Sequence, residues 1–153
     1  MTARRVSPDH TSCSRDSFES KLVEGLWNPL PDVAETCAWS LGRLRVKAAV
    51  PDLCDVIRER TDLDAVRAAA IRALGEIGDC DALPTLLAVA RNGHVTVRLA
   101  AIETLERLDL DTSLTKDIGE IARTEPSDRL RAKAEEILRR VNDSHKVEEN
   151  DAN

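Results

Sequence analysis

The amino-acid sequence predicts an all-α fold, a right-handed α-solenoid of about eight helices in about four repeats. One observation is a repeated line: residues 66–75 read Val-Arg-Ala-Ala-Ala-Ile-Arg-Ala-Leu-Gly, and related lines follow at 97–105 and 130–138. The first arginines of these lines stand 31 and 33 residues apart. Repeats of this length are typical of solenoids, in which each repeat buries its apolar face only by stacking on its neighbours. The other observation is that aromatic residues make up only 2% of the chain. A core of Leu, Ile, Val and Ala suits close helix packing better than a sheet sandwich.

The chain is predicted to open with a helix over residues 16–27. Asp16 and Glu19 have the spacing of a capping box, in which two side chains satisfy the first free N–H groups of a helix. The apolar residues of this segment are Leu22, Val23 and Leu26. They occur in the same order as the apolar residues of a later second helix, so we interpret 16–27 as the second helix of a truncated opening repeat.

Each full repeat is expected to contain two helices, as the central repeat illustrates. Its first helix has an apolar stripe at helical spacing. The stripe consists of Val66, Ala70, Ile71 and Leu74. Gly75 and Gly78 loosen the end of this helix and permit a left-handed cap. In the second helix we expect Asp81 to be the N-cap, Pro84 to lie in the first turn, and the Asn-Gly pair at 92–93 to end the helix.

The same pattern places the remaining helices. They are predicted at 32–45, 48–60, 95–108 and 113–123, and from Asp128 to about Val141. The repeat domain therefore covers residues 16–141. Residues 1–15 have no hydrophobic periodicity, and residues 142–153 hold four acids against one lysine, so both are predicted to be disordered tails.

Charge and cysteine usage narrow the possible partners. The formal net charge is −6 and the pI is near 5.1, which opposes a general affinity for nucleic acid or anionic membrane. No apolar run approaches the length of a membrane span, and the first residues are not followed by the apolar region of a leader. The four cysteines show no C-x-x-C spacing, and Cys37 and Cys54 occupy positions of small core residues. A reducing, cytoplasmic compartment is therefore predicted.

The repeated lines resemble HEAT repeats, specifically the short HEAT-like class first named from phycobilisome lyase subunits. The resemblance rests on residues 64–75, on Ala-Val-Pro at 49–51 and on Ala-Leu-Pro at 82–84, and it covers roughly residues 30–141. It implies a non-enzymatic scaffold or adaptor that binds another protein. The alternative that the family name implies is a bilin lyase subunit or chromophore-handling protein, and nucleic-acid binding is a third possibility that the charge disfavours.

The sequence lacks the residue patterns that would carry catalysis or metal binding. HEAT-like deoxyhypusine hydroxylases place iron on His-Glu dipeptides, whereas His10, His94 and His145 are followed here by Thr, Val and Lys. The sequence has no glycine-rich phosphate loop and no nucleophile elbow. We therefore expect no catalytic residue, no cofactor and no metal site.

Two tryptophans are candidate partner-binding residues. The residues that align with Trp39 in the later repeats are Arg72, Glu103 and Glu136. Trp27 aligns with Arg91, so both large apolar side chains occupy positions that are charged in sister repeats. Because exposed tryptophans are common at interface hot spots, the alignment favours a partner surface at Trp27 and Trp39. The alternative is that the truncated opening repeat, or the N-terminal segment with Val6 and Pro8, buries them.

The second helices, expected to line a concave face, are the other candidate surface. The candidate partner-binding residues on this face are Asp52, Asp55 and Thr85. The two aspartates could share one face of their helix, where paired carboxylates are more typical of solvated surface than of acid–base catalysis.

Recurrent arginines support two interpretations. Those at or beyond the ends of second helices are Arg58, Arg60, Arg91 and Arg123. They could complement the negative end of each helix, or they could form a basic ladder for an anionic partner, as in HEAT-like DNA glycosylases. The arginines of the repeated line, Arg67, Arg98 and Arg131, are expected to bridge to acids between repeats.

Overall fold

The computed structural model describes residues 10–108 and 112–151, with side-chain surroundings for 15–108 and 114–143. In these residues the chain forms eight α-helices and two short 3-10 helices. The α-helices are α1 (His10–Gly25), α2 (Pro31–Arg43), α3 (Val50–Glu59), α4 (Asp64–Ile77), α5 (Leu83–Asn92), α6 (Val95–Arg107), α7 (Thr112–Thr124) and α8 (Asp128–Asp151). The 3-10 helices, η1 (Lys47–Ala49) and η2 (Cys80–Ala82), lead into α3 and α5. The predicted all-α solenoid of about four repeats is confirmed.

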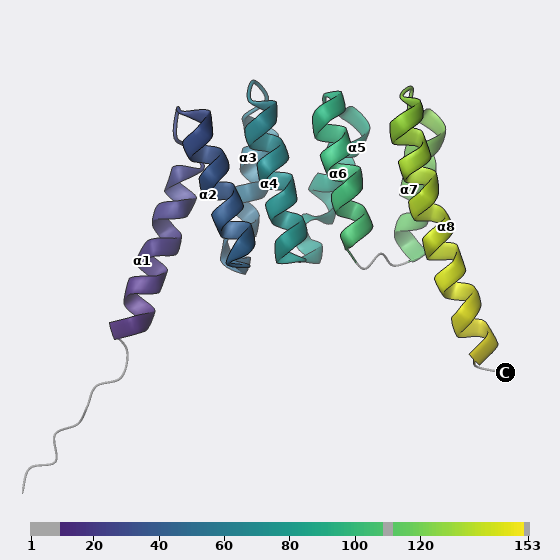
Figure 1. The fold of residues 1–153 in the computed structure, drawn as a ribbon, viewed down its shortest axis with the longest axis horizontal. Coiled ribbons are helices and arrows are strands. Elements are labelled where there is room, and N and C mark those ends of the chain that lie inside the picture. Colours follow the sequence, from purple (N-terminus) through teal and green to yellow (C-terminus); the bar gives the residue numbers. More distant parts are fainter. Residues whose placement is uncertain (1–9, 109–111, 152–153) are drawn as a thin grey trace, which may run out of the picture.

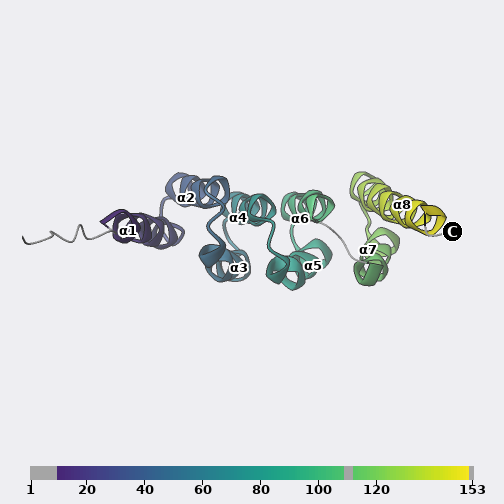
Figure 2. The same ribbon diagram turned by 90° about the horizontal axis from the view of Figure 1, so that it is seen from below.

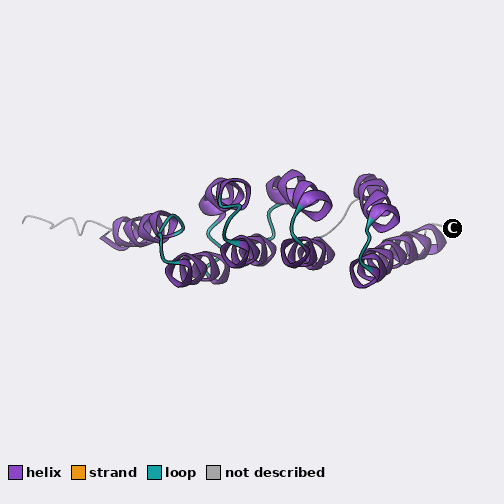
Figure 3. Ribbon diagram, turned by 90° about the horizontal axis from the view of Figure 1, so that it is seen from above, coloured by secondary structure: helices purple, strands orange, loops and turns teal. Residues whose placement is uncertain are grey.

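The helices lie in two layers. The first helices of the repeats, α2, α4, α6 and α8, stand side by side in one layer, and α3, α5 and α7 form the other (Figures 1 and 2). Short loops join successive helices along the described stack (Figure 3). The core between the layers consists of aliphatic side chains, because each helix buries a stripe of Leu, Ile, Val and Ala. Helix α1 packs on α2 as α3 packs on α4, which agrees with the interpretation of a truncated opening repeat.

Two of the contacts within the first-helix layer depend on glycine. A Cβ at Gly42 in α2 would lie 2.7 Å from the Cα of Ala73 in α4, so any larger residue would push the helices apart. A Cβ at Gly75 in α4 would lie 2.9 Å from the Cγ2 of Thr104 in α6. Gly42 therefore lets two backbones approach closely, whereas Gly75 makes room for the Thr104 side chain, and both interfaces are densely packed.

The contact between α6 and α8 is different in kind. In the next repeat, the position equivalent to Gly42 and Gly75 is occupied by Glu106. Its carboxylate pairs with the Lys133 ammonium at 2.8 Å and with the Arg140 guanidinium, both on α8. Charged side chains thus join the last repeat to the stack where glycines join the earlier ones.

The turns after α2 and α4 show how the repeat varies. Gly78 ends α4 in the left-handed region with φ of 72°, as predicted. Arg45 occupies the equivalent place after α2 with φ of 51°, and its N–H donates to the Gly42 carbonyl while the Val46 N–H donates to the Leu41 carbonyl. This is a Schellman motif with an arginine where glycine is favoured. The predicted N-cap Asp81 is wrong: the residue before α5 is Ala82, which has no capping side chain, and the Asp79 side chain instead accepts from the Asp81 N–H and caps η2.

The predicted tails are wrong where they fall on described residues. Helix α1 begins at His10 and helix α8 continues to Asp151, so residues 10–15 and 142–151 are helical. Neither stretch contains glycine or proline to end a helix, and a polar composition describes a solvated helix as well as a coil. Residues 1–9, 152 and 153, also predicted as tail, lie outside the described residues.

Candidate functional site

A groove on the first-helix layer contains Trp39. It has a volume of about 450 Å³ and lies over α2, α4 and α6. The residues that carry its chemistry are Glu35, Trp39 and Arg43 of α2, Arg72 and Glu76 of α4, and Arg107 of α6. The Trp39 side chain is 63% exposed although it is the largest side chain in the groove. Its exposure follows from its position, which is occupied by charged residues in the later repeats.

The charges around Trp39 are unevenly paired. The Arg43 guanidinium carbon lies 5.8 Å from the centre of the Trp39 ring, close enough for a cation–π contact. Arg107 pairs with Glu76 at 3.3 Å across the interface between α4 and α6. Arg72 has no ion pair with any of the described residues, and it lies between these two features. Arg43 and Arg72 were not identified from the sequence as residues of this surface. The alignment of Arg72 with Trp39 was a signal that these two side chains face the same surface.

Trp27 lies in a different setting. It follows the end of α1 and is 42% exposed. Its neighbours Leu26 and Asn28 accept hydrogen bonds through their carbonyl oxygens from Nη1 of Arg60, at 2.8 and 2.9 Å. Neither tryptophan is a buried cap residue in the described part of the chain, and Val6 and Pro8 of the alternative interpretation lie outside it. No contact described here joins Trp27 to Trp39.

The candidate residues of the second helices do not form one surface. Thr85 is only 9% exposed, so it is a poor candidate for partner binding. The reason is that α5 is covered on more than one side, since Leu86, Leu87, Val89 and Ala90 are also buried. Asp55 pairs with Arg58 on its own helix at 2.6 Å, and Asp52 lines a hollow between α1 and α3.

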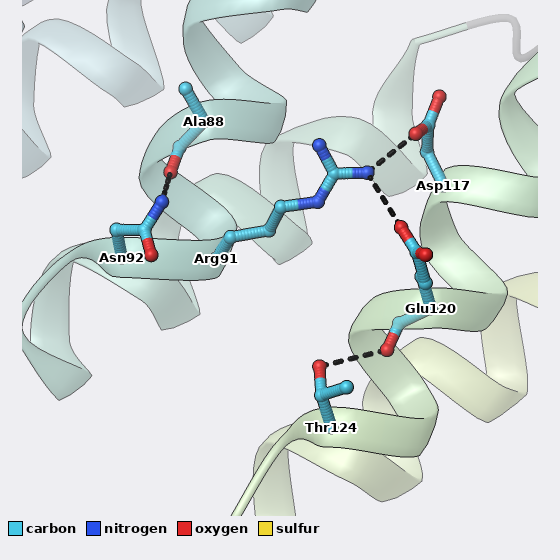
Figure 4. Close-up of polar contacts among 6 residues, drawn as sticks. All are labelled: Ala88, Arg91, Asn92, Asp117, Glu120 and Thr124. Carbon is cyan, nitrogen blue, oxygen red and sulfur yellow. Dashed lines mark hydrogen bonds and ion pairs between the residues drawn. The ribbon is translucent and has the colours of Figure 1, made fainter.

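Two of the four arginines at second-helix ends, Arg60 and Arg91, join their helix to another one, and Arg58 pairs on its own helix. Arg60 stabilises the carboxyl end of α1, a helix of another repeat, where the carbonyl groups lack helical partners. Arg91 at the end of α5 pairs with Asp117 and, at 3.4 Å, with Glu120 on α7 (Figure 4). The predicted alternative of a free basic ladder is therefore wrong for Arg58, Arg60 and Arg91.

The arginines of the repeated line also hold neighbouring elements together, in two ways. Nε of Arg67 donates to the Ile57 carbonyl at 2.8 Å, and Arg131 donates twice to the Glu125 carbonyl, so both satisfy groups near the end of the preceding second helix. Only Arg98 reaches an acid outside its own helix, the Glu125 carboxylate at 2.9 Å, which follows α7 in the same repeat. The predicted bridge from these arginines to acids of another repeat is therefore wrong: Arg67 and Arg131 reach the preceding repeat through backbone carbonyls, and the acid partner of Arg98 lies within its own repeat.

Cys37 and Cys54 are placed as small apolar residues, whereas Cys80 is exposed. Cys54 is buried in α3, and Cys37 is half-buried where α2 packs against Gly25 of α1. Burial raises the pKa of the Cys37 thiol, which disfavours its reactive thiolate. The side chain of Cys13 lies outside the described residues.

Among the described side chains, no three His, Cys, Asp or Glu residues gather closely enough to hold a metal ion. No described helix combines the length and the apolarity that crossing a membrane requires.

Comparison with known families identifies the repeats. Two overlapping segments, residues 19–106 and 59–139, match HEAT repeats. No curated protein matches the chain. The match is to HEAT repeats in general and does not single out the phycobilisome-lyase class. Since the matched segments cover most of the chain and the helix pairs stack as such repeats do, the chain belongs to the HEAT-repeat family.

Proposed function

We propose that the chain is a non-enzymatic scaffold that binds another protein through the groove containing Trp39. The observation that carries the proposal is a largely exposed tryptophan lining a groove of about 450 Å³. Tryptophan is enriched at interface hot spots because it buries a large, rigid area when a partner covers it. Stacked helical repeats also commonly use their extended surfaces for binding.

The alternative, a bilin lyase subunit, has weaker support. It rests on family analogy alone, and a shared fold does not imply a shared function. No described residue favours it. Phycobilisome genes beside the gene for this chain would be the observation that promotes it.

The proposal is tested by exchanging each tryptophan for the residue type at its aligned position. Trp39→Glu should leave the free energy of unfolding within about 0.5 kcal/mol of wild type, because exposed sites tolerate change. It should weaken capture of the partner by about thirtyfold, the equivalent of about 2 kcal/mol for a hot-spot aromatic. Trp27→Arg is the matched control and should capture as wild type does.

Two results would contradict this proposal in different ways. Undiminished capture by a folded Trp39→Glu variant would remove the groove as the binding surface. Loss of capture with Trp27→Arg alone would move the surface to the end of α1. Cross-linking from residue 39, followed by mass spectrometry, identifies whether the captured protein contacts the groove directly.

A further inference from the structure

The groove has two cationic groups, Arg43 and Arg72, that form no ion pair with a described residue. Among the described residues neither Arg43 nor Arg72 pairs with a carboxylate, although the chain has a formal net charge of −6. The other basic group of the groove, Arg107, is paired with Glu76. The Arg43 guanidinium lies over the ring of Trp39, so the indole and both cations are close to one another.

The groove continues beyond Arg72. A second hollow of about 350 Å³ shares Arg72 and Arg107 with the first and extends across α6 to Lys133 of α8. Lys133 is paired with Glu106 and Glu136, so this second hollow adds length rather than free positive charge. Arg72 thus stands where the two hollows meet, midway along a track that crosses the first helices.

We propose that this groove binds an acidic segment of the partner protein, with an apolar side chain on Trp39 and a carboxylate on Arg72. The inference rests on the proposed function and adds the chemistry of the partner. A guanidinium is suited to this task because its planar fork can donate two parallel hydrogen bonds to one carboxylate. The cation over Trp39 orients the ring while leaving the indole largely exposed for an apolar contact.

The carboxylates of the groove favour a peptide over a nucleic acid. Glu35 and Glu76 line the same groove as the arginines, and Glu103 borders the second hollow. A continuous row of phosphates would meet these acids, whereas a peptide can place separate carboxylates opposite the arginines and other residues opposite the glutamates. The alternation of arginines and glutamates in the groove, more than its net charge, therefore favours an acidic peptide over a nucleic acid.

The test uses short synthetic peptides in which one Leu or Ile is flanked on both sides by Glu. Matched sets carry Lys or Gln in place of Glu, and an oligothymidylate provides the nucleic-acid comparison. The protein is the full chain with Trp27→Phe, so that tryptophan emission reports Trp39 alone. We expect a saturable change in emission below about 1 mM with the Glu set only, weakened by added salt.

Two charge-reversal variants test whether the peptide binds in the groove. Arg72→Glu, the residue type found at the aligned position 103, should weaken binding of the Glu set at least about tenfold. Arg123→Glu makes the same charge change on α7, outside the groove, and should bind as the parent does. Equal binding of the Lys set, preference for the oligothymidylate, no saturation with the Glu set, or unchanged binding by Arg72→Glu would each overturn the proposal.

The two proposals fail separately. If capture of the protein partner requires Trp39 but the Glu set does not bind, the scaffold function stands and the acidic chemistry is wrong. If capture does not depend on Trp39, the groove is not the functional surface, whatever the peptides do.

Discussion

The contacts of α2, α4 and α6 differ from the contact between α6 and α8, although all belong to one repeating layer. Gly42 and Gly75 let backbones approach Ala73 and Thr104 closely. Glu106, at the next equivalent position, instead pairs with charges on α8. Close packing gains dispersion and apolar burial that salt does not screen, whereas exposed ion pairs contribute little and are screened. One sequence pattern can therefore support two kinds of interface, and the contact between α6 and α8 contains the kind that salt screens, beside the buried Leu130, Ala134 and Ile137 of α8.

The largest expected loss of stability comes from a substitution in the closely packed helices α2, α4 and α6. Ala70 is fully buried in α4, so Ala70→Asp should lower the free energy of unfolding by about 3–5 kcal/mol, because it buries a charge without a partner. Ala65→Asp, at an exposed position of the same helix near its N-terminus, is the control and should change little. Urea unfolding followed by circular dichroism measures both. A wild-type midpoint for Ala70→Asp would contradict the packing described.

Glycine contacts can be tested by adding one methyl group. Gly42→Ala should cost about 1–3 kcal/mol, since the new Cβ would meet the backbone of Ala73. Gly119→Ala in α7 places its Cβ in open space, so the same substitution there should gain up to about 1 kcal/mol from helix propensity. Thermal melts of the two variants should shift in opposite directions. Equal gains would mean that the α2–α4 contact is not limited by the backbone.

The stability contributed by the ion pairs between α6 and α8 should depend on salt. Glu106→Gln removes the carboxylate that holds Lys133 and Arg140, at an expected cost of about 1 kcal/mol in dilute buffer. In about 1 M salt the difference from wild type should shrink, because partly exposed pairs are screened. Gly42→Ala serves as the comparison, since its cost should not depend on salt. A cost for Glu106→Gln that is independent of salt would erase the distinction between the two interfaces.

A substitution in the turn after α2 is expected to stabilise the fold. Arg45 adopts φ of 51°, a left-handed conformation that glycine adopts without strain, so Arg45→Gly should gain about 0.5–1 kcal/mol. The matched reverse change is Gly78→Ala in the next repeat, which should lose about as much. Paired denaturant titrations would detect both. A loss with Arg45→Gly would show that the arginine side chain offsets the strain of its backbone.

The smallest effect concerns pH. Hydrogen bonds to Glu106 and Glu136 raise the pKa of Lys133 above its ordinary value of 10.5. The charged form is therefore favoured by folding, and its contribution is complete below pH 10.5 and is lost as the pH rises through the higher folded value. The melting temperature of wild type should approach that of Lys133→Met in that alkaline range. Parallel curves at all pH values would contradict the assignment.

Much of the fold follows from local signals in the sequence. The left-handed cap at Gly78 and the end of α5 at Asn92 are set by residues within the same turn, and they occur as predicted. The exposure of Trp39 followed from its alignment with charged residues. These features depend on neighbours along the chain or on equivalence between repeats, and both are visible in a sequence.

What could not be predicted depends on contacts between distant elements. Arg60 reaches carbonyl groups 32 and 34 residues earlier, and a long side chain gives no sequence signal for such a partner. Thr85 is buried because neighbouring helices cover α5 on several sides, which the polarity of one residue does not reveal. The groove itself is assembled from three helices of different repeats, so its free arginines could be recognised only once those helices were placed.

The glycine contacts also define a unit of length. Ala73 meets Gly42 as Thr104 meets Gly75, so residues 43–75 run between equivalent points of successive repeats. A second copy of 43–75 inserted after Gly75 would set a new Ala73 against the original Gly75, and a new Gly75 against Thr104. The contact between the two copies of α4 would be new, but it would set a glycine against an alanine as Gly42 and Ala73 already do. The solenoid is in this sense a modular part whose span, and the reach of the surface it offers, can be set by counting copies.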